Sequence, residues 1–371
     1  MPCRLPVSLV LVIFVLSQNS LCQSEGRAPS SQVSLIAQKV KDSRKGDSTS
    51  EHRALSITDT IKLTGVDIGM LAGMPTCDAD GNFYLRNDVD LHSPIHKLSL
   101  KGEKKADFLP ASSIDLPNLP PELAHADKFW VTDDGELYLE VMVSWNEHDF
   151  LLFGKDGTYK SKVELDNAAL WHVSTFAVFP SGEFLITGDM WQKLEQNYAP
   201  FTAIFSSRGT FLKKLSLEDD EKIYQYTVNK DSDFVNQYGK NRAIDKGEMK
   251  AAADGNIYLM RWLSPAVIYA ISPGGEVVRR FTVSPDQSGM MPSNMRVAGD
   301  TIAIEFRNSA TKKHVIKVVD LEGRERASYD FPVLDGKPLW VSVCYLENPE
   351  RFVFLDQAKD DSPVLRIAEP R

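Results

Sequence analysis

Basic residues are too few in this chain to suggest a nucleic-acid-binding surface. Lys and Arg number 42 against 51 Asp and Glu, which gives a formal net charge of −9. Because non-specific binding to nucleic acid needs a basic footprint, this balance argues against DNA or RNA as a partner. It also argues against docking on anionic lipid through charge alone.

Long apolar runs are also scarce. The clearest run covers residues 9–16, follows Arg4 and ends at the polar segment 17–20. It is too short to cross a bilayer, and its place after a positive charge is typical of an export signal. We therefore expect a signal peptide over residues 1–22, no transmembrane segment in the mature chain, and a periplasmic or extracellular monomer. Cleavage after Cys22 is favoured over a lipid anchor on Cys22, because Leu21 stands where a lipoprotein signal needs a small residue.

Cysteine is rare outside this leader. Of the four Cys residues, Cys3 and Cys22 lie in the expected signal, which leaves Cys77 and Cys344. Two Cys in an exported protein allow a disulfide. We favour the other interpretation, two unpaired thiols buried in core strands, because the geometry of a bridge is narrow.

Several catalytic motifs are absent. The sequence has no Gly-x-Ser-x-Gly nucleophile elbow and no glycine-rich phosphate loop. The string 78–82, Asp-Ala-Asp-Gly-Asn, lacks the twelve-residue spacing and terminal Glu of a Ca²⁺ loop. We therefore expect no cofactor. If a divalent cation does bind, the candidate oxygen ligands are the loop carboxylates of Asp88, Asp90 and Asp189.

The chain does contain a short phrase repeated six times, an acidic or Gly turn followed by alternating apolar residues. Its copies begin at Asp80, Asp134, Ser181, Asp254, Gly299 and Pro349, the last two being degraded. A unit of roughly 40–50 residues with tight turns between strands is typical of a propeller blade. Each unit divides into four strands, named A to D in chain order. In the second unit, strands A to D cover residues 128–132, 137–143, 150–153 and 159–165. In the fourth unit, they cover residues 249–253, 257–262, 267–271 and 277–283.

The last unit is one strand short. The chain ends after strands at 352–355 and 364–367, while residues 57–63 form a spare strand near the N-terminus. Pairing the spare strand with the last unit would close the ring and remove two exposed sheet edges. We therefore predict an all-β fold over residues 55–371, a six-bladed β-propeller closed by an N-terminal strand that completes the last blade. Residues 23–54 are expected to form a flexible polar linker.

The phrases at 78–85 and 251–259 resemble the NHL repeat, whose corresponding phrase is Asp-x-x-Gly-Asn-Ile-Tyr-Val. The chain is thus similar to bacterial six-bladed β-propellers related to NHL repeats and, more distantly, to TolB-like propellers. The resemblance covers roughly residues 55–371, and its motifs specify turns and strands. It implies the fold and leaves the activity open, since such families include interaction scaffolds, lactonases and lyases.

Loop length differs between the two faces of the predicted propeller. The A–B and C–D turns are short, whereas most long loops join B to C and D to A, including 166–175, 188–201 and an insertion at 218–248. Five Trp and four His lie in or beside these loops, as a ligand site would require. The candidate ligand-binding residues are Trp145, His148, Trp171, His172, Trp191, Arg261 and Trp262.

Two functions are compatible with these features. We favour a non-catalytic exported module that binds a peptide, a glycan or an envelope protein on its long-loop face. The alternative is a divalent-metal-dependent enzyme of the lactonase or lyase type, with its site at the mouth of the channel.

Overall fold

A computed structural model describes residues 52–63, 75–88, 91–109, 125–144, 147–166, 171–192, 197–220, 249–339, 341–360 and 362–371. These ranges belong to one compact unit spanning residues 40–371. The elements in them are the strands β1 to β26, so the fold is all-β, as predicted.

Four sheets have four antiparallel strands each, paired in chain order. The first sheet contains β2 (Thr76–Cys77), β3 (Phe83–Arg86), β4 (Ile95–Leu98) and β5 (Lys104–Phe108). The second contains β6 (His125–Val131), β7 (Leu137–Ser144), β8 (Glu147–Phe153) and β9 (Tyr159–Glu164). The third contains β10 (Trp171–Val178), β11 (Phe184–Gln192), β12 (Asn197–Phe205) and β13 (Phe211–Leu215). The fourth contains β14 (Lys250–Ala251), β15 (Ile257–Arg261), β16 (Ala266–Ile271) and β17 (Val277–Val283).

A fifth sheet has eight strands and joins the two ends of the described chain. Its order is β18 (Met291–Ala298), β19 (Thr301–Asn308), β20 (Lys313–Asp320), β21 (Glu325–Asp330), β1 (His52–Lys62), β26 (Pro363–Pro370), β25 (Arg351–Gln357) and β24 (Val341–Leu346). A short hairpin, β22 (Val333–Leu334) and β23 (Lys337–Pro338), follows β21.

The predicted pairing of the N-terminal strand with the last strand is confirmed. β1 pairs antiparallel with β26 from Leu55 to Lys62. The strand begins earlier than expected, because residues 52–54, which the sequence analysis placed in the linker, pair in parallel with residues 328–330 of β21. β1 therefore bridges two groups of strands that would otherwise each end in an open edge.

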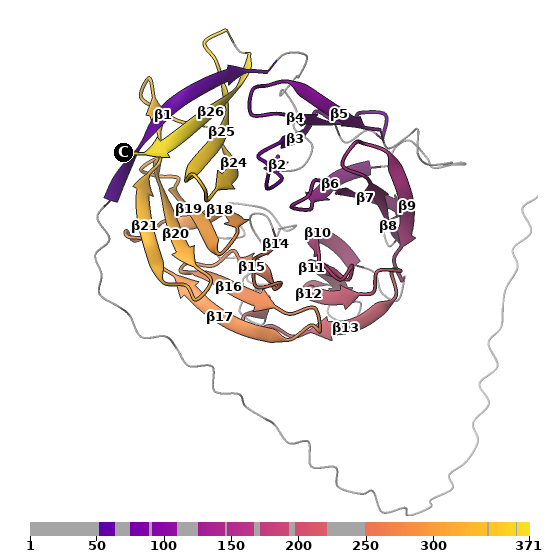
Figure 1. The fold of residues 1–371 in the computed structure, drawn as a ribbon. Helices are drawn as coiled ribbons and strands as arrows, with labels where there is room; N and C mark the ends of the chain where they lie inside the picture. Colours follow the sequence, from indigo (N-terminus) through magenta and orange to yellow (C-terminus); the bar gives the residue numbers. More distant parts are fainter. Residues whose placement is uncertain are drawn as a thin grey trace, which may run out of the picture. The chain divides into compact units, whose positions relative to one another are not determined.

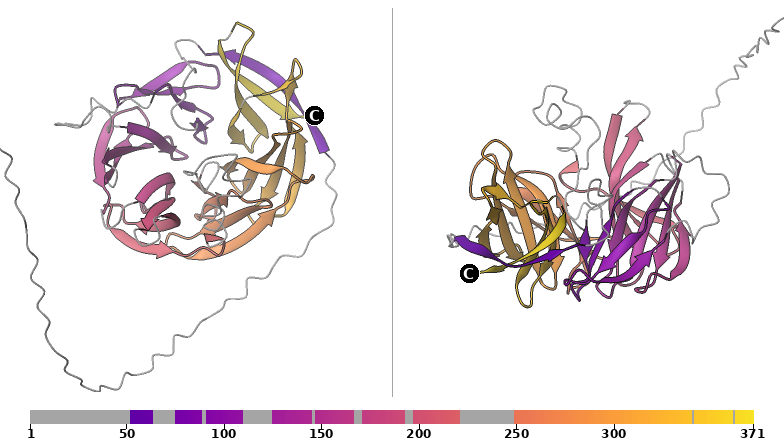
Figure 2. Two further views of the ribbon diagram at one scale, coloured as in Figure 1. Left: turned by 180° about the vertical axis from the view of Figure 1, so that it is seen from behind. Right: turned by 90° about the horizontal axis from the view of Figure 1, so that it is seen from above.

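The sheets have a propeller-like arrangement around a common axis (Figure 1). The innermost strands contact one another in a closed cycle, β2 to β6, β6 to β10, β10 to β14, β14 to β18, β18 to β24 and β24 to β2. Figure 2 shows the same ring from behind and from above. Between neighbouring sheets the core is apolar and aromatic; for example, the Phe150 and Phe176 rings of the second and third sheets have centroids 4.5 Å apart.

The ring has two sides because the strands alternate in direction. Turns from the first to the second strand and from the third to the fourth strand of a sheet lie on one side, here called the turn side. The other connections lie on the opposite loop side. Neighbouring turns meet on the turn side, where Ala79 N donates to Asp133 O at 3.1 Å and Ala253 N donates to Gly299 O at 2.8 Å.

Two of the predicted loop-side loops are shorter than expected. β10 begins at Trp171, within the predicted loop 166–175, and the hairpin of β11 and β12 extends from both ends into the predicted loop 188–201. Cross-strand pairs run from Trp171↔Met190 to Val178↔Phe184 and from Phe184↔Phe205 to Gln192↔Asn197. Backbone groups that a loop would leave to water are satisfied by this pairing.

The repeated sequence phrase builds a hydrogen-bonded turn. In the first sheet, Asp78 Oδ1 accepts from Asn82 N at 2.8 Å, and Gly81 adopts a φ of +78° that favours glycine. The Tyr84 hydroxyl donates to Asp78 Oδ2 at 2.9 Å and lies 3.4 Å from Gly135 O of the second sheet. In the first sheet, the phrase therefore ties its turn to its own sheet and to the next one.

Candidate functional site

A recess of about 440 Å³ lies on the turn side where inner strands converge. Its lining comes from β2, β14, β18, β24 and the start of β25, and from the turns that follow β2, β4, β6, β18 and β24. We call it the axial recess and define it by Cys77, Asp80, Asp133, Lys250, Arg296 and Glu347.

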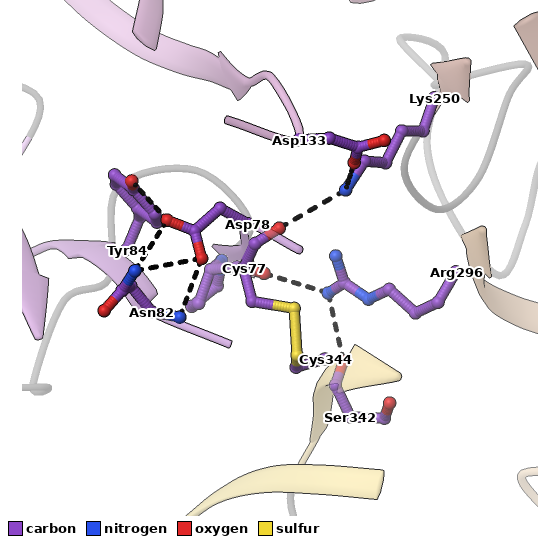
Figure 3. Close-up of a disulfide and its surroundings, with 10 residues drawn as sticks. Cys77, Asp78, Asn82, Tyr84, Asp133, Lys250, Arg296, Ser342 and Cys344 are labelled. Carbon is purple, nitrogen blue, oxygen red and sulfur yellow. Dashed lines mark hydrogen bonds and ion pairs between the residues drawn. A yellow bond between two sulfur atoms is a disulfide. The ribbon is translucent and has the colours of Figure 1, made fainter. Parts of the chain in front are cut away.

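A disulfide between Cys77 and Cys344 lies beside the axial recess (Figure 3). The bond joins β2 to β24, with an S–S distance of 1.99 Å and a Cα–Cα distance of 5.6 Å. The favoured sequence interpretation, two unpaired thiols, is therefore wrong. The expectation that both residues lie buried in core strands is confirmed. β2 and β24 become neighbours only because the ring closes, which brings together residues separated by 267 positions.

Two buried cations form the floor of the recess. The Lys250 ammonium donates to Asp133 Oδ1 at 2.7 Å and lies 3.5 Å from Cys77 O. Arg296 Nη2 donates to Pro75 O at 2.9 Å and to Ser342 O at 3.0 Å. Figure 3 shows both side chains pointing toward the disulfide from β14 and β18. Because buried Lys and Arg need partners, these bonds hold the cations in place and tie non-adjacent sheets together.

Carboxylates occupy the rim. Asp80 and Asp133 are exposed, and Glu347 is half-buried. Burial and the neighbouring Asp300 raise the pKa of Glu347 above its usual range. The recess therefore presents a cationic floor beneath an anionic rim.

The carboxylate of Asp78, beneath the rim, is already engaged. It is buried, lies 3.3 Å from Lys97 Nζ, and accepts from Tyr84. Burial and the adjacent Asp78 raise the pKa of the Tyr84 hydroxyl far above its usual range. This group supports the recess wall and is not free to meet a ligand.

Three of the predicted ligand-binding residues lie together in the third sheet. Trp171 and His172 open β10, and Trp191 lies near the end of β11. Trp171 is opposite Met190 and His172 is opposite Asp189, so the three backbones are adjacent at the loop-side end of one sheet. Their side chains, and all of Trp145, lie outside what the structure describes.

The remaining three candidates, His148, Arg261 and Trp262, are buried. His148 lies in β8, and its Nδ1 is 2.7 Å from Glu140 Oε1. Arg261 ends β15 and donates to Thr202 Oγ1 at 3.1 Å and to Asp220 Oδ1 at 2.8 Å. Trp262 is also buried. Their assignment to a ligand site stays a prediction.

The candidate metal ligands are only partly described. Asp88 follows β3, Asp90 lies outside the described residues, and Asp189 lies in β11 with an undescribed side chain. Within the described ranges, no group of three or more His, Cys, Asp or Glu could hold a metal ion. The metal-enzyme alternative stays a prediction.

In the same ranges, no helix has the length and hydropathy needed to cross a membrane. The insertion at 218–248 is described only as far as Asp220.

The sequence analysis missed the axial recess. Asp133 and Glu347 lie in short turns that look alike in every unit, and Lys250 and Arg296 interrupt inner strands that are otherwise mostly apolar. A charged residue in a predicted inner strand was the available signal, because such a residue needs a partner inside the fold.

No protein-family model matches the sequence, and no curated protein matches it. Solved structures with a similar fold include virginiamycin B lyase from Staphylococcus aureus, a catalytically inactive variant bound to quinupristin. It shares 12% identity over 89% of this chain and 99% of that one, with a TM-score of 0.44. A protein of unknown function from Bacteroides caccae shares 11% identity over 70% of this chain and 81% of that one, with a TM-score of 0.42. A prolyl endopeptidase shares 11% identity over 81% of this chain and 50% of that one, with a TM-score of 0.41. At these values the similarities carry no inference about activity.

Proposed function

We propose that the protein is a non-catalytic binding module whose ligand enters the axial recess. The observation that carries this proposal is the cationic floor of Lys250 and Arg296 beneath the rim carboxylates. The recess volume of about 440 Å³ falls within the usual range of ligand sites, about 300–1,000 Å³. An ammonium has three N–H donors, and among the described residues Asp133 and Cys77 O account for two of those of Lys250.

The charge arrangement selects a class of ligand. An anionic group would face the third donor of Lys250, and a cationic group would meet Asp80 at the rim. A short peptide with a free carboxylate and a free amine satisfies both requirements. Because the floor cations are already held by backbone carbonyls and the wall by a disulfide, the site would lose little conformational freedom on binding.

The architecture we propose for this module is a six-bladed propeller. The closed cycle of six innermost strands supports it, as does the division of the eight-stranded sheet where β21 and β1 share only three residue pairs. On this count, β18 to β21 form one blade, and β24 to β26 with β1 form the last.

The module is proposed to work outside the cytoplasm as a monomer. The apolar run near the N-terminus supports export, and so does the Cys77–Cys344 bridge, because disulfides persist in oxidising compartments.

Calorimetric titration with tri-alanine tests the binding proposal. Tri-alanine with free termini should bind, and its C-terminal amide should bind about tenfold more weakly, because the amide no longer offers a carboxylate to Lys250. Asp80→Asn should weaken binding of the free peptide several-fold, whereas Glu276→Gln, at an exposed turn of the fourth sheet outside the recess, should not. Equal binding of the peptide and its amide, or no binding of either, would contradict the proposal.

A further inference from the structure

A second recess, of about 550 Å³, lies on the loop side at the start of β20 and the end of β21. Its wall comes from the turn between β19 and β20, from the start of β20 and from the β22–β23 hairpin. We call it the loop-side recess and define it by Lys312, Lys313, His314, Phe331, Val333 and Pro338. It shares no lining residue with the axial recess.

The floor of this recess is an aromatic ring already flanked by cationic and polar groups. Phe331 is buried, with the His314 ring edge-on at 5.2 Å and the Arg307 guanidinium 5.9 Å from the ring centre. Val333 beside it is 61% exposed, the highest fraction among the large apolar side chains described. The recess therefore offers apolar contact area that reaches solvent.

Two lysines at the edge of the recess are held in position by a turn. Asn308 Oδ1 accepts from Ala310 N and Thr311 N, both at 3.0 Å, and the chain passes through Lys312 with a φ of +55°. Lys312 and Lys313 are both exposed, and neither has an ion pair among the described residues. Asp330 also lines the recess, but it has an interaction of its own. In a chain with net charge −9, an unneutralised lysine pair is a local attraction for an acidic group.

The His314 ring lines the recess beside Phe331. Its Nδ1 atom is buried and has no hydrogen-bond partner within the part of the chain that the structure describes. Burial and the nearby Arg307 lower the pKa of His314 to about 4, so the imidazole is neutral near pH 7. A neutral ring can donate or accept a hydrogen bond without repelling Lys312 and Lys313.

We propose that the loop-side recess binds an acidic peptide segment that carries an apolar side chain next to its carboxylates. The carboxylates would lie between Lys312 and Lys313, and the apolar side chain would cover Phe331, Val333 and Pro338. A peptide fits better than a small inorganic anion because the recess combines a charged edge with an apolar floor and is large enough for several side chains.

Fluorescence anisotropy with labelled octapeptides tests this proposal. The probe is Gly-Glu-Asp-Leu-Phe-Glu-Asp-Gly with an amidated C-terminus, so that no free carboxyl end is offered to the axial recess. One comparison peptide replaces the acidic residues by Gln and Asn, and the other replaces Leu-Phe by Ser-Ser. The acidic apolar probe should bind at least about tenfold more tightly than either comparison peptide.

Charge-reversal variants locate the binding. Lys312→Glu with Lys313→Glu should weaken binding about tenfold or more, and Val333→Ser about threefold. The matched control, Lys213→Glu with Lys214→Glu, reverses the same charge on an exposed pair in β13 and should change binding less than twofold. Since both pairs are exposed, the urea midpoints of both double variants should match that of the wild type.

Four results would overturn the proposal. They are no binding of the acidic apolar probe, equal binding of a comparison peptide, an equal effect of the two double variants, and complete displacement of the probe by millimolar glutarate. The last result would show that a free dicarboxylate, and not a peptide, is recognised.

Discussion

Removal of the Cys77–Cys344 bridge is the sharpest test of how this ring is held together. The bond links β2 to β24 across 267 positions of the chain. In the loop-entropy description, cross-linking a loop of this length reduces the entropy of the unfolded chain by an amount worth about 5.5 kcal/mol at 25 °C. Measured values usually fall below this limit, so we expect the free energy of unfolding to drop by about 2–5 kcal/mol when the bridge is lost.

Cys77→Ala, Cys344→Ala and the double variant should all show this loss. Each of them opens the same loop, so the three should agree to within about 1 kcal/mol, which allows for the different packing of the two buried side chains. Equilibrium unfolding in urea, monitored by Trp fluorescence, measures this loss in the free energy of unfolding. With a urea slope of about 3 kcal/mol/M, the midpoint should fall by about 1 M.

Two results would refute this reasoning. A double variant with the wild-type midpoint would show that the bridge does not constrain the unfolded chain. A loss confined to one single variant would show that the effect comes from packing at that site. Wild-type protein in a strong reductant, once the bond is shown by thiol titration to be open, should match the double variant.

Four further predictions follow from contacts described above. Tyr84→Phe should destabilise the fold by about 1–3 kcal/mol in urea unfolding, because Asp78 loses a buried donor; Tyr159→Phe, at a more exposed ring, should change stability by less than about 0.5 kcal/mol. Deleting residues 52–62 should expose the edges of β21 and β26 and cause aggregation, detected by light scattering; a monomeric product with unchanged melting would argue against closure by β1. Because the pKa of His314 is lowered to about 4 in the folded protein, the free energy of unfolding should fall as the pH is lowered from about 6.5 to 4. In urea unfolding at each pH, His314→Phe should reduce this fall by about 1–3 kcal/mol. The same dependence on pH in the variant and the wild type would contradict this prediction. EDTA should leave the melting temperature unchanged, and metal analysis should find no stoichiometric Zn²⁺ or Ca²⁺, whereas the metal-enzyme alternative requires the opposite.

Local patterns in the sequence were enough to predict most strands. The strands predicted for the second and fourth units occur with bounds that differ by three residues or fewer, because alternating apolar residues and Gly turns act within a few positions. The pairing of β1 with β26 was also predictable, since one unit lacked a strand and another strand had no local partner.

Contacts that depend on ring closure could not be predicted in the same way. The geometry that permits the Cys77–Cys344 bond exists only when β2 meets β24, and the axial recess exists only when turns from several sheets converge. His148 illustrates the opposite error. Its position beside a polar segment suggested an exposed loop, but cross-strand pairing carries it into β8 beside Glu140, a buried partner that the loop assignment did not consider.

The pairing of β1 with β26 has a consequence for the order in which the molecule can be completed. During synthesis, β1 is the first of these strands to emerge and its partner is the last, so it must wait unpaired while nearly the whole chain is made. The final assembly step is therefore a non-local one whose rate should fall with the length of chain between the two strands. A circular permutant whose new ends lie at the exposed turn 272–276, with the old ends joined between β26 and β1, would make that pairing local and should reach the native state sooner.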